Sequence, residues 1–535
     1  MTSTPAPRSS DPVSGSAAAT LTDDLSAQPV SGITLGVTGL RPRWTLTAWG
    51  SIVEWGAEVA PLDWFVAADD RWHVPSQEPT VRQRRLEGTP VVETRVRIPD
   101  GDVVQRAWGV PERGGLVVVE FENESPLPIA VALTGPPVVT ERPPAKVPIQ
   151  GIELPDDAVV LPVGHHATVR VLLASRPGDG PSGPSDRGFP VVPPPLASVR
   201  GWTRVTEHAS RLVLPDETLV EALTDARCDL LLDGPVDPEN DPTGFLLDVA
   251  ELVRCGDDAE AWLPDVVLPA EEVAKGLRDG GDVDRREAID SLRAARLVAS
   301  RAQDETATAD LDRILDDVAR RASDATGSRR RRGLLGGRRR SADPSSGGPS
   351  AAGSPPPISF ADLRRTTSVG RFVRSIERRI VDPASTADGS TADLLPGGVP
   401  TGWLGSNFEV HHVPSGPGSS VSFAVRWHGE RPAVLWEQHG GNVTLTSPSI
   451  DADWSTSDDS GETLWAAPAA ASPRRGSLSV VASSDDGPAS EPSRPSKPGA
   501  GHVDPTPDAA GPDSAPTIRP PDLSGGTSDD GVSFS

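Results

Sequence analysis

The chain has 535 residues, enough for two to four domains, and its formal net charge of −25 argues against general nucleic-acid binding. It holds only two cysteines, Cys228 and Cys255, too few to staple a fold of this size, so we expect both to be reduced and buried. The first residues lack the apolar core of a signal peptide, and no apolar run reaches the ~20 residues of a membrane helix. A cytoplasmic protein without a membrane span is expected.

Composition predicts that both ends of the chain are disordered. Residues 1–28 form a leader rich in Ser, Thr, Pro and Ala. Residues 469–535 form an acidic tail rich in Ser, Pro, Asp and Gly. Neither segment has enough apolar side chains to form a core.

Residues 29–200 are predicted to form an antiparallel β-sandwich. Apolar and polar residues alternate over VETRVRI (92–98), the turn sequence PDGD follows, and VVQRAW (103–108) returns as a partner strand. Residues 116–134 and 158–175 each read as one more strand pair joined by a turn. Five tryptophans in the first part could offer a stacking platform to a sugar, but a sandwich core is the favoured interpretation. They are Trp44, Trp49, Trp55, Trp64 and Trp72.

The hydrophobic period changes to that of helices after Trp202. Helices are expected over 214–234, 243–256, 269–278, 284–302 and 305–323, within a helical domain of residues 201–326. A disordered Arg-rich linker, 327–357, separates it from a helix in 358–383 that completes the domain. A small C-terminal β domain, 384–468, follows. The expected fold class is therefore multidomain α+β.

Four segments resemble the six-hairpin (α/α toroid) glycoside hydrolases, the group of glycogen-debranching and glucoamylase-like enzymes. They are ETRVRIPDGDVVQRAW with GLVVVEFENESPLPIAVAL (93–133), LVLPDETLVEALTDARCDLLL (212–232), FLLDVAELVRCGDDAEA (245–261) and LLPGGVPTGWLGSNFEVHHVPSGPGSSVSFAVRW (394–427). The resemblance implies a sandwich, a helical toroid and a β domain in this order, with two carboxylates as general acid and base. The helices counted here make about half a toroid, and substrate loops like those of the family are not found. This departure favours a shortened relative that has lost catalysis.

Paired acids and paired histidines are the first candidate sites. Asp229 with Asp233, and Asp248 with Glu251, lie one helical turn apart, which a solvated face of an acidic protein explains. The acids of PVDPENDPTG (235–244) favour turn formation and helix capping over a cation site. The pairs His165-His166 and His411-His412 cannot chelate one ion from a regular strand, since adjacent side chains point to opposite faces. We expect no metal site and no cofactor.

The basic region is the most unusual local feature. Residues 327–380 contain thirteen arginines and three acids, a net of +10. Such a segment could contact an acidic partner or another anionic surface, or it could be a solvated linker. Few aromatics interleave with the arginines, so specific nucleic-acid recognition is not indicated. The candidate contact residues within 327–340 are Arg329, Arg330, Arg331, Arg332, Arg338, Arg339 and Arg340.

The stretch VSFAVRWHGERPAVLWEQHGGNVTLT (421–446) reads as a three-stranded meander packed by its aromatics. Trp403, Trp436 and Glu437 are the candidate carbohydrate contacts. Taken together, the sequence predicts a carbohydrate-related protein without catalytic activity. Two alternatives remain open: a scaffold protein acting through its Arg-rich linker and acidic tail, and an active glycosidase acting on α-glucans.

Overall fold

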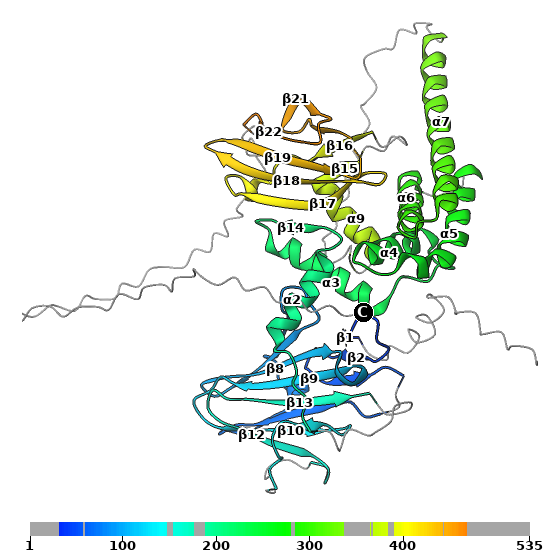
Figure 1. Ribbon diagram of the computed structural model, residues 1–535. Helices are drawn as coiled ribbons and strands as arrows, with labels where there is room; N and C mark the ends of the chain where they lie inside the picture. Colours follow the sequence, from blue (N-terminus) through cyan, green and yellow to red (C-terminus); the bar gives the residue numbers. More distant parts are fainter. Residues whose placement is uncertain are drawn as a thin grey trace, which may run out of the picture. The chain divides into compact units, whose positions relative to one another are not determined.

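The computed structural model describes residues 31–56, 59–146, 154–175, 188–279, 284–335, 364, 367–383, 390–441 and 443–467. Within these ranges the chain is a multidomain α+β protein, as expected: antiparallel sheets come first, seven α-helices follow, and two further sheets come last (Figure 1). The expected leader 1–28, the tail 469–535 and residues 336–357 of the expected linker lie outside the described residues.

The N-terminal strands form sheets of three, four and six strands, ordered β1-β2-β3, β12-β10-β4-β5 and β11-β13-β9-β8-β7-β6. Their bounds are β1 Ile33–Gly36, β2 Arg43–Leu46, β3 Ile52–Glu54, β4 Asp63–Ala67, β5 Trp72–His73, β6 Arg82–Arg85, β7 Val92–Ile98, β8 Gly101–Val110, β9 Leu116–Asn123, β10 Ile129–Thr134, β11 Val139–Thr140, β12 Val159–Val163 and β13 Thr168–Ala174. Two short 3₁₀ helices, η1 Pro75–Gln77 and η2 Glu112–Gly114, lie between strands.

One of the three expected strand pairs is a hairpin, and the other two are not. Strands β7 and β8 pair antiparallel with Val96 opposite Val103, which confirms the expected turn between them. The expected pairs in 116–134 and 158–175 are wrong, because β9 and β13 pair with each other in the six-stranded sheet while β10 and β12 pair in the four-stranded sheet. Each connection crosses from one sheet to the other, so local alternation predicted the strands but not their partners.

The sandwich core confirms the favoured interpretation of the tryptophans in part. Trp44 and Trp64 are buried in one apolar cluster, and Trp64 packs 5.4 Å from Phe121, measured between ring centroids. Trp49 is 38% exposed. Two of the five rings therefore stabilise the core by burial, whereas Trp55 and Trp72 are half-buried.

The seven helices differ from expectation mainly at their ends. They are α2 Pro195–Thr206, α3 Glu217–Asp233, α4 Pro242–Arg254, α5 Ala259–Asp279, α6 Arg285–Arg301, α7 Glu305–Leu335 and α9 Val369–Ile380. The sequence analysis missed α2, which begins within a proline run because Pro195 occupies the first turn, where no amide donor is needed. Helix α5 starts ten residues early and continues through Pro264 and Pro269. Helix α7 includes residues 327–335 of the expected linker.

Two C-terminal sheets follow, ordered β14-β17-β18-β19-β22 and β15-β16-β20-β21. Their strands are β14 Arg211–Val213, β15 Val381–Pro383, β16 Thr391–Leu394, β17 Phe408–Gly416, β18 Ser419–His428, β19 Arg431–His439, β20 Thr444–Ser447, β21 Asp451–Thr456 and β22 Ser460–Leu464, and η4 Thr401–Trp403 lies among them. The expected three-stranded meander is wrong in its third strand. Strands β18 and β19 form the hairpin, but β20 joins the other sheet and β22 pairs with β19 instead.

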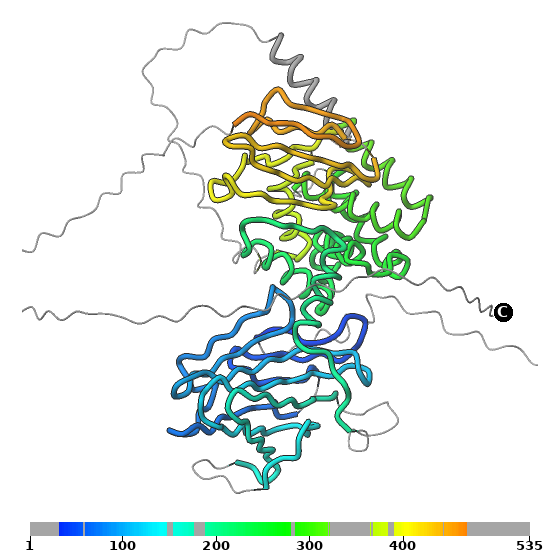
Figure 2. Tube along the Cα trace, turned by 60° about the vertical axis from the view of Figure 1, so that its left-hand side comes forward, coloured from blue at the N-terminus to red at the C-terminus, as the bar shows by residue number. Residues whose placement is uncertain are grey.

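The helices and the C-terminal sheets share one hydrophobic core. A single cluster of buried side chains extends from Trp202 in α2 to Trp465 after β22. Strand β14, between α2 and α3, pairs with β17, and α9 leads directly into β15. Figure 2 shows these green helices beside the yellow and orange strands. The helical region and the C-terminal strands therefore fold as one packed body, whereas the sequence suggested separate domains.

Two expectations from composition can be checked here. Cys228 and Cys255 are both free and buried, as expected. None of the helices in the described ranges is both long enough and apolar enough to cross a membrane.

Candidate functional site

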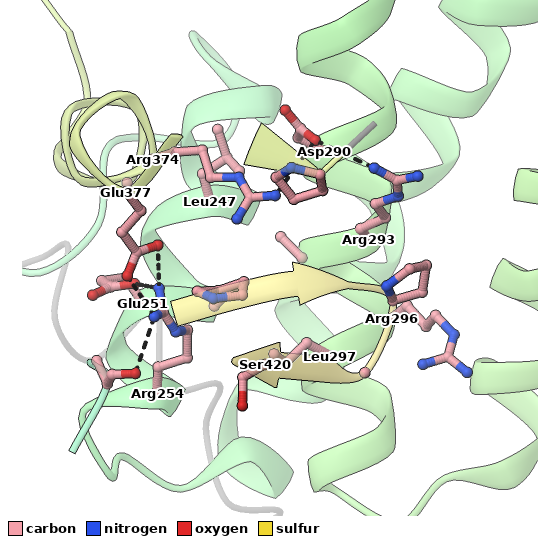
Figure 3. Close-up of a pocket in the computed structure, with 18 of the residues that line it drawn as sticks. Leu247, Glu251, Arg254, Asp290, Arg293, Arg296, Leu297, Arg374, Glu377 and Ser420 are labelled. Atoms are coloured by element: carbon pink, nitrogen blue, oxygen red, sulfur yellow. Dashed lines mark hydrogen bonds and ion pairs between the residues drawn. The ribbon is translucent and has the colours of Figure 1, made fainter. Parts of the chain in front are cut away.

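A pocket of about 470 Å³ lies among α4, α6, α9 and the turn that joins β17 to β18 (Figure 3). Its wall carries five arginines and three carboxylates, an unusual composition for a protein with a net charge of −25. The charged residues are Glu251 and Arg254 from α4, Asp290, Arg293, Arg296 and Arg301 from α6, and Arg374 and Glu377 from α9. Apolar contacts come from Leu247 and Leu297.

Two helix caps and one ion pair hold α4 and α9 against each other. Asp241 caps α4 by accepting a hydrogen bond from the Gly244 amide at 2.9 Å, and Ser368 caps α9. Arg371 of α9 forms an ion pair with Asp241, so the two helix starts are tied together. Gly370 packs on the α4 backbone, where a Cβ would come within 2.4 Å of the Leu247 carbonyl carbon. This close approach brings Glu251 and Glu377 into one site.

A charge-balanced network fills one end of the pocket, and we call it the Arg227 network. Arg227 of α3 is 2% exposed and donates to Glu251 at 2.6 Å and to Glu377 at 3.3 Å. Its remaining donors reach the carbonyl oxygen and hydroxyl of Ser210 at 2.8 and 2.7 Å. Arg254 bridges the same two glutamates at 2.6 Å each. Two arginines and two glutamates thus cancel in charge.

The pKa values at this end agree with tight pairing. Burial alone would raise the pKa of Glu377. The charge and hydrogen bonds of Arg254, together with the charge of Arg227, outweigh burial and hold this pKa below its ordinary value. Burial would lower the pKa of Arg254, yet Glu251 and Glu377 raise it. Glu377 therefore stays ionised at neutral pH and cannot serve as a proton donor.

The other end of the pocket is built differently. Asp290 is 4% exposed and pairs with Arg378, while Arg293 and Arg374 each place a nitrogen 3.8 Å from it. Figure 3 shows Asp290 and Arg293 away from the group of Glu251, Arg254 and Glu377. Asp382, next to Arg378 at 3.9 Å, also pairs with Arg286. The Asp290 cluster consists of Arg286, Arg293, Arg374, Arg378, Asp290 and Asp382.

The candidate carbohydrate contacts lie outside this pocket and are mostly buried. Trp403 is 7% exposed and packs edge-on against Phe408, with 5.3 Å between ring centroids. Trp436 is 8% exposed and packs against Trp454 at 5.6 Å. Glu437 is 67% exposed, on the opposite face of β19 from Trp436. Rings buried in this way fill the core, and their faces are not open for a sugar to stack on.

Part of the basic region is helical. Arg329, Arg330, Arg331 and Arg332 lie on the backbone of α7, which ends at Leu335. Arg338, Arg339 and Arg340 lie outside the described residues. Contact of this region with an anionic surface stays a prediction.

The solvated-face interpretation of the acid pairs is wrong. Asp248 is 1% exposed and accepts hydrogen bonds from the backbone amides of Val236 and Gly370, while Glu251 belongs to the Arg227 network. Asp229 of α3 forms an ion pair at 2.6 Å with Arg85, which lies on β6 of the N-terminal sheets. Spacing alone cannot tell a solvated pair from a buried one, because the arginine partners come from distant segments.

Asp237 and Asp241 form a turn and a helix cap, as expected. Asp237 accepts from the Glu239 amide at 3.0 Å, a turn interaction, and Asp241 is a helix cap. The strand placement of His165 and His166 is wrong, because both lie in the turn between β12 and β13 and their ring centroids are 3.9 Å apart. The ring of His165 lies 3.0 Å from the Ser125 carbonyl oxygen. In the described ranges, no group of three or more His, Cys, Asp or Glu is placed to hold a metal ion.

The Asp290 cluster was missed by sequence reasoning, although one signal was available. Arg371, Arg374 and Arg378 recur at intervals of three and four, so they share one face of α9. A basic helix face beside an apolar one indicates acidic partners on another element.

No family model matches the chain, and no curated protein matches it. The resemblance to six-hairpin glycosidases therefore stays a prediction.

Proposed function

We propose that this chain is a non-catalytic, carbohydrate-related binding protein that takes a small polar ligand in the pocket between α4, α6, α9 and the β17–β18 turn. The resemblance to six-hairpin glycosidases is the reason for proposing a carbohydrate ligand. The proposal also includes a cytoplasmic location. The observation that carries the non-catalytic part is the pairing of every carboxylate on the pocket wall with arginine.

A glycosidase needs one carboxylic acid that holds a proton and one carboxylate that acts as base or nucleophile. Glu251 and Glu377 are the two glutamates of the pocket, which makes them the natural candidates. Both are bridged by Arg227 and Arg254, and the lowered pKa of Glu377 opposes a role as acid. Binding without hydrolysis is the function that this geometry supports best.

The test combines binding with turnover on the full-length protein. Calorimetric titration with glucose, maltotriose and glucose 6-phosphate measures binding, and release of reducing sugar from maltotriose measures hydrolysis. We expect at least one of these ligands to bind and no sugar to be released. Hydrolysis that disappears in Glu377→Gln would overturn the proposal, and so would the absence of binding by all three.

A second candidate, an interaction protein that uses its basic region, draws on the length of α7. The helical backbone carries Arg329–Arg332 beyond Val318, a buried apolar residue of α7. A variant lacking 327–357 would then lose binding to an acidic partner such as polyglutamate, with strong dependence on salt. Unchanged binding in that variant would exclude this candidate.

A further inference from the structure

Strand β22 forms an open edge of the five-stranded sheet. It is the last strand in the order β14-β17-β18-β19-β22, and β19 is the strand with which it pairs. Packing on β19 fixes its position, since a Cβ at Gly461 would come within 2.5 Å of the Trp436 ring. The other side of β22 is therefore a preformed surface.

Two hydrogen bonds at the ends of β22 show which of its backbone groups face β19. The amide of Trp465 donates to the carbonyl oxygen of Pro432 at 3.0 Å. The amide of Gln438 donates to the carbonyl oxygen of Asp459 at 2.7 Å. Because every second residue of an antiparallel strand bonds to the same neighbour, the odd-numbered residues between these ends face β19. The even-numbered residues face the open side.

Three amides consequently point away from β19, those of Ser460, Glu462 and Leu464. Within the described part of the chain, none of the three has a backbone hydrogen-bond partner. The carbonyl oxygen of Leu464 accepts from Arg431 at 2.9 Å, so the carbonyl oxygens of the other two residues complete the open edge. A row of unpaired backbone groups is a template for pairing with another extended segment.

Two other sheet edges carry features that oppose such pairing. Strand β6, at the edge of the six-stranded sheet, contains Arg82, Arg84 and Arg85, and the edge strand β12 contains Pro162, which has no amide donor. Charged side chains and proline are common means of protecting an edge. Strand β22, SGETL, has one charged residue and no proline, so it lacks this protection.

The sequence around the open edge is acidic. Residues 432–467 contain six acids and neither lysine nor arginine. The acids are Glu437, Asp451, Asp453, Asp458, Asp459 and Glu462. Asp459 aside, these acids form no ion pair with an arginine or lysine in the described ranges. Glu437 is 67% exposed and lies opposite Ser460, so its side chain shares a face of the sheet with Glu462.

Two exposed leucines lie on the same face. Leu435 is opposite Glu462 and is 43% exposed, and Leu464 is 42% exposed. An added strand would place one side chain against Leu464 and another, two residues away, against Glu462. An apolar side chain fits the first position and a basic one fits the second.

We propose that the open edge of β22 binds an extended basic segment of a partner protein, which adds a strand to the five-stranded sheet. Main-chain hydrogen bonds at Ser460, Glu462 and Leu464 supply affinity, and alternate side chains supply selectivity. The recognised pattern is an arginine or lysine two residues from an apolar residue. Rising salt weakens the binding, because the attracting charges are exposed.

The test measures binding of labelled peptides to the full-length protein by fluorescence anisotropy. The probe is the peptide TVTRTRT. One control, TVTETET, reverses its charge. The other control is TVTRTRT with a methyl group on every backbone nitrogen, which keeps the charge but removes the donors for strand pairing. We expect TVTRTRT to bind at least about tenfold more tightly than either control.

Amide hydrogen exchange, resolved by residue, locates the bound peptide. Saturating TVTRTRT should slow the exchange of the amides of Ser460, Glu462 and Leu464 by about tenfold or more. The amides of Gly461 and Thr463, which face β19, should change little. Unchanged exchange at the first three amides would overturn the proposal.

A substitution tests the charge of the edge. Glu462→Gln should weaken TVTRTRT binding by about two- to fivefold, the effect of an exposed ion pair. The matched control is Glu272→Gln, at an exposed glutamate of α5, which should leave binding unchanged. Equal binding by Glu462→Gln and the wild type would overturn a basic partner.

The remaining outcomes point to another occupant or to none. Failure of TVTRTRT to bind, or equal binding of its methylated form, would overturn strand addition. Slow exchange of the three amides before any peptide is added, lost in a variant lacking 469–535, would assign the edge to the chain's own tail. Slow exchange that increases with protein concentration would assign it to a second copy. Either assignment would overturn the proposed partner protein.

Discussion

The two ends of the pocket use the same residue types and reach opposite results. In the Arg227 network, two arginines and two glutamates satisfy one another within 3.3 Å, and Ser210 accepts and donates the remaining bonds. In the Asp290 cluster, Arg374 stays 3.8 Å from a carboxylate already paired with Arg378. The first arrangement ties helices together with hydrogen bonds, whereas the second leaves the guanidinium of Arg374 on the pocket wall.

The largest expected effect comes from breaking the balanced end. Glu377→Gln leaves Arg227 and Arg254 with one carboxylate between them in a buried site. We expect the free energy of unfolding to fall by about 3–5 kcal/mol, because an uncompensated buried charge remains. Urea denaturation measures it. Glu207→Gln, at a partly exposed ion pair with Arg211, is the control and should cost less than about 1 kcal/mol. A loss for Glu377→Gln as small as the control's would refute the balanced network.

The hydrogen-bond geometry of Arg227 can be tested by a substitution that keeps its positive charge. Arg227→Lys keeps one positive charge but cannot reach Glu251, Glu377 and both Ser210 oxygens from one ammonium group. We expect a loss of about 2–3 kcal/mol in urea denaturation, from two or more unmade buried hydrogen bonds. Full stability in this variant would mean that charge alone matters and the fork does not.

A third region, on α3, contains a carboxylate whose burial opposes ionisation. On α3, three aspartates at intervals of four face the N-terminal sheets, and burial raises the pKa of Asp233 to about 6. The folded state therefore binds a proton that the unfolded state releases above a pH of about 4, so this group's contribution to stability falls as the pH rises from about 4 to about 6.

The prediction follows from that sign. Asp233→Asn should raise the free energy of unfolding by about 1–2 kcal/mol at pH 8 and have little effect at pH 4. Urea denaturation at the two pH values measures the difference. A variant that is destabilised at pH 8 would contradict this sign, and would show that the ionised carboxylate of Asp233 is needed by Arg43, its attractive neighbour.

The smallest effect is expected at the Asp290 cluster in the protein without ligand. Arg374→Gln removes one of the crowded charges while Arg378 still pairs with Asp290. The melting temperature of the unliganded protein should stay the same or rise slightly, within about 1 kcal/mol in free energy. A loss comparable to that of Arg227→Lys would mean that Arg374 holds the fold, and the contrast between the two ends would disappear.

Much of the fold could be predicted from the sequence. Period-two alternation at 92–98 and 103–108 predicted β7 and β8, and the helical period over 214–234 predicted α3 closely. It failed where partners are distant in the chain: β20 leaves the expected meander because its neighbours are β16 and β21. Apolar alternation specifies which face is buried but not against which strand.

The site was less accessible to sequence reasoning than the fold. Asp248 and Glu251 were visible as an acid pair, but their burial depends on Gly370 and on arginines of α3 and α4. Trp403 and Trp436 were chosen because tryptophan binds sugars, yet packing against Phe408 and Trp454 buries them. Charge balance in a pocket is a property of four helices at once, which no single segment displays.

The central claim, a ligand-binding pocket without catalytic carboxylates, is tested most directly by a crystal structure of the full-length protein with bound glucose, maltotriose or glucose 6-phosphate. The account predicts the ligand in the pocket between α4, α6, α9 and the β17–β18 turn, with Glu251 and Glu377 still held by Arg227 and Arg254. A ligand bound elsewhere, or a glutamate released from its arginines to contact the sugar, would contradict it.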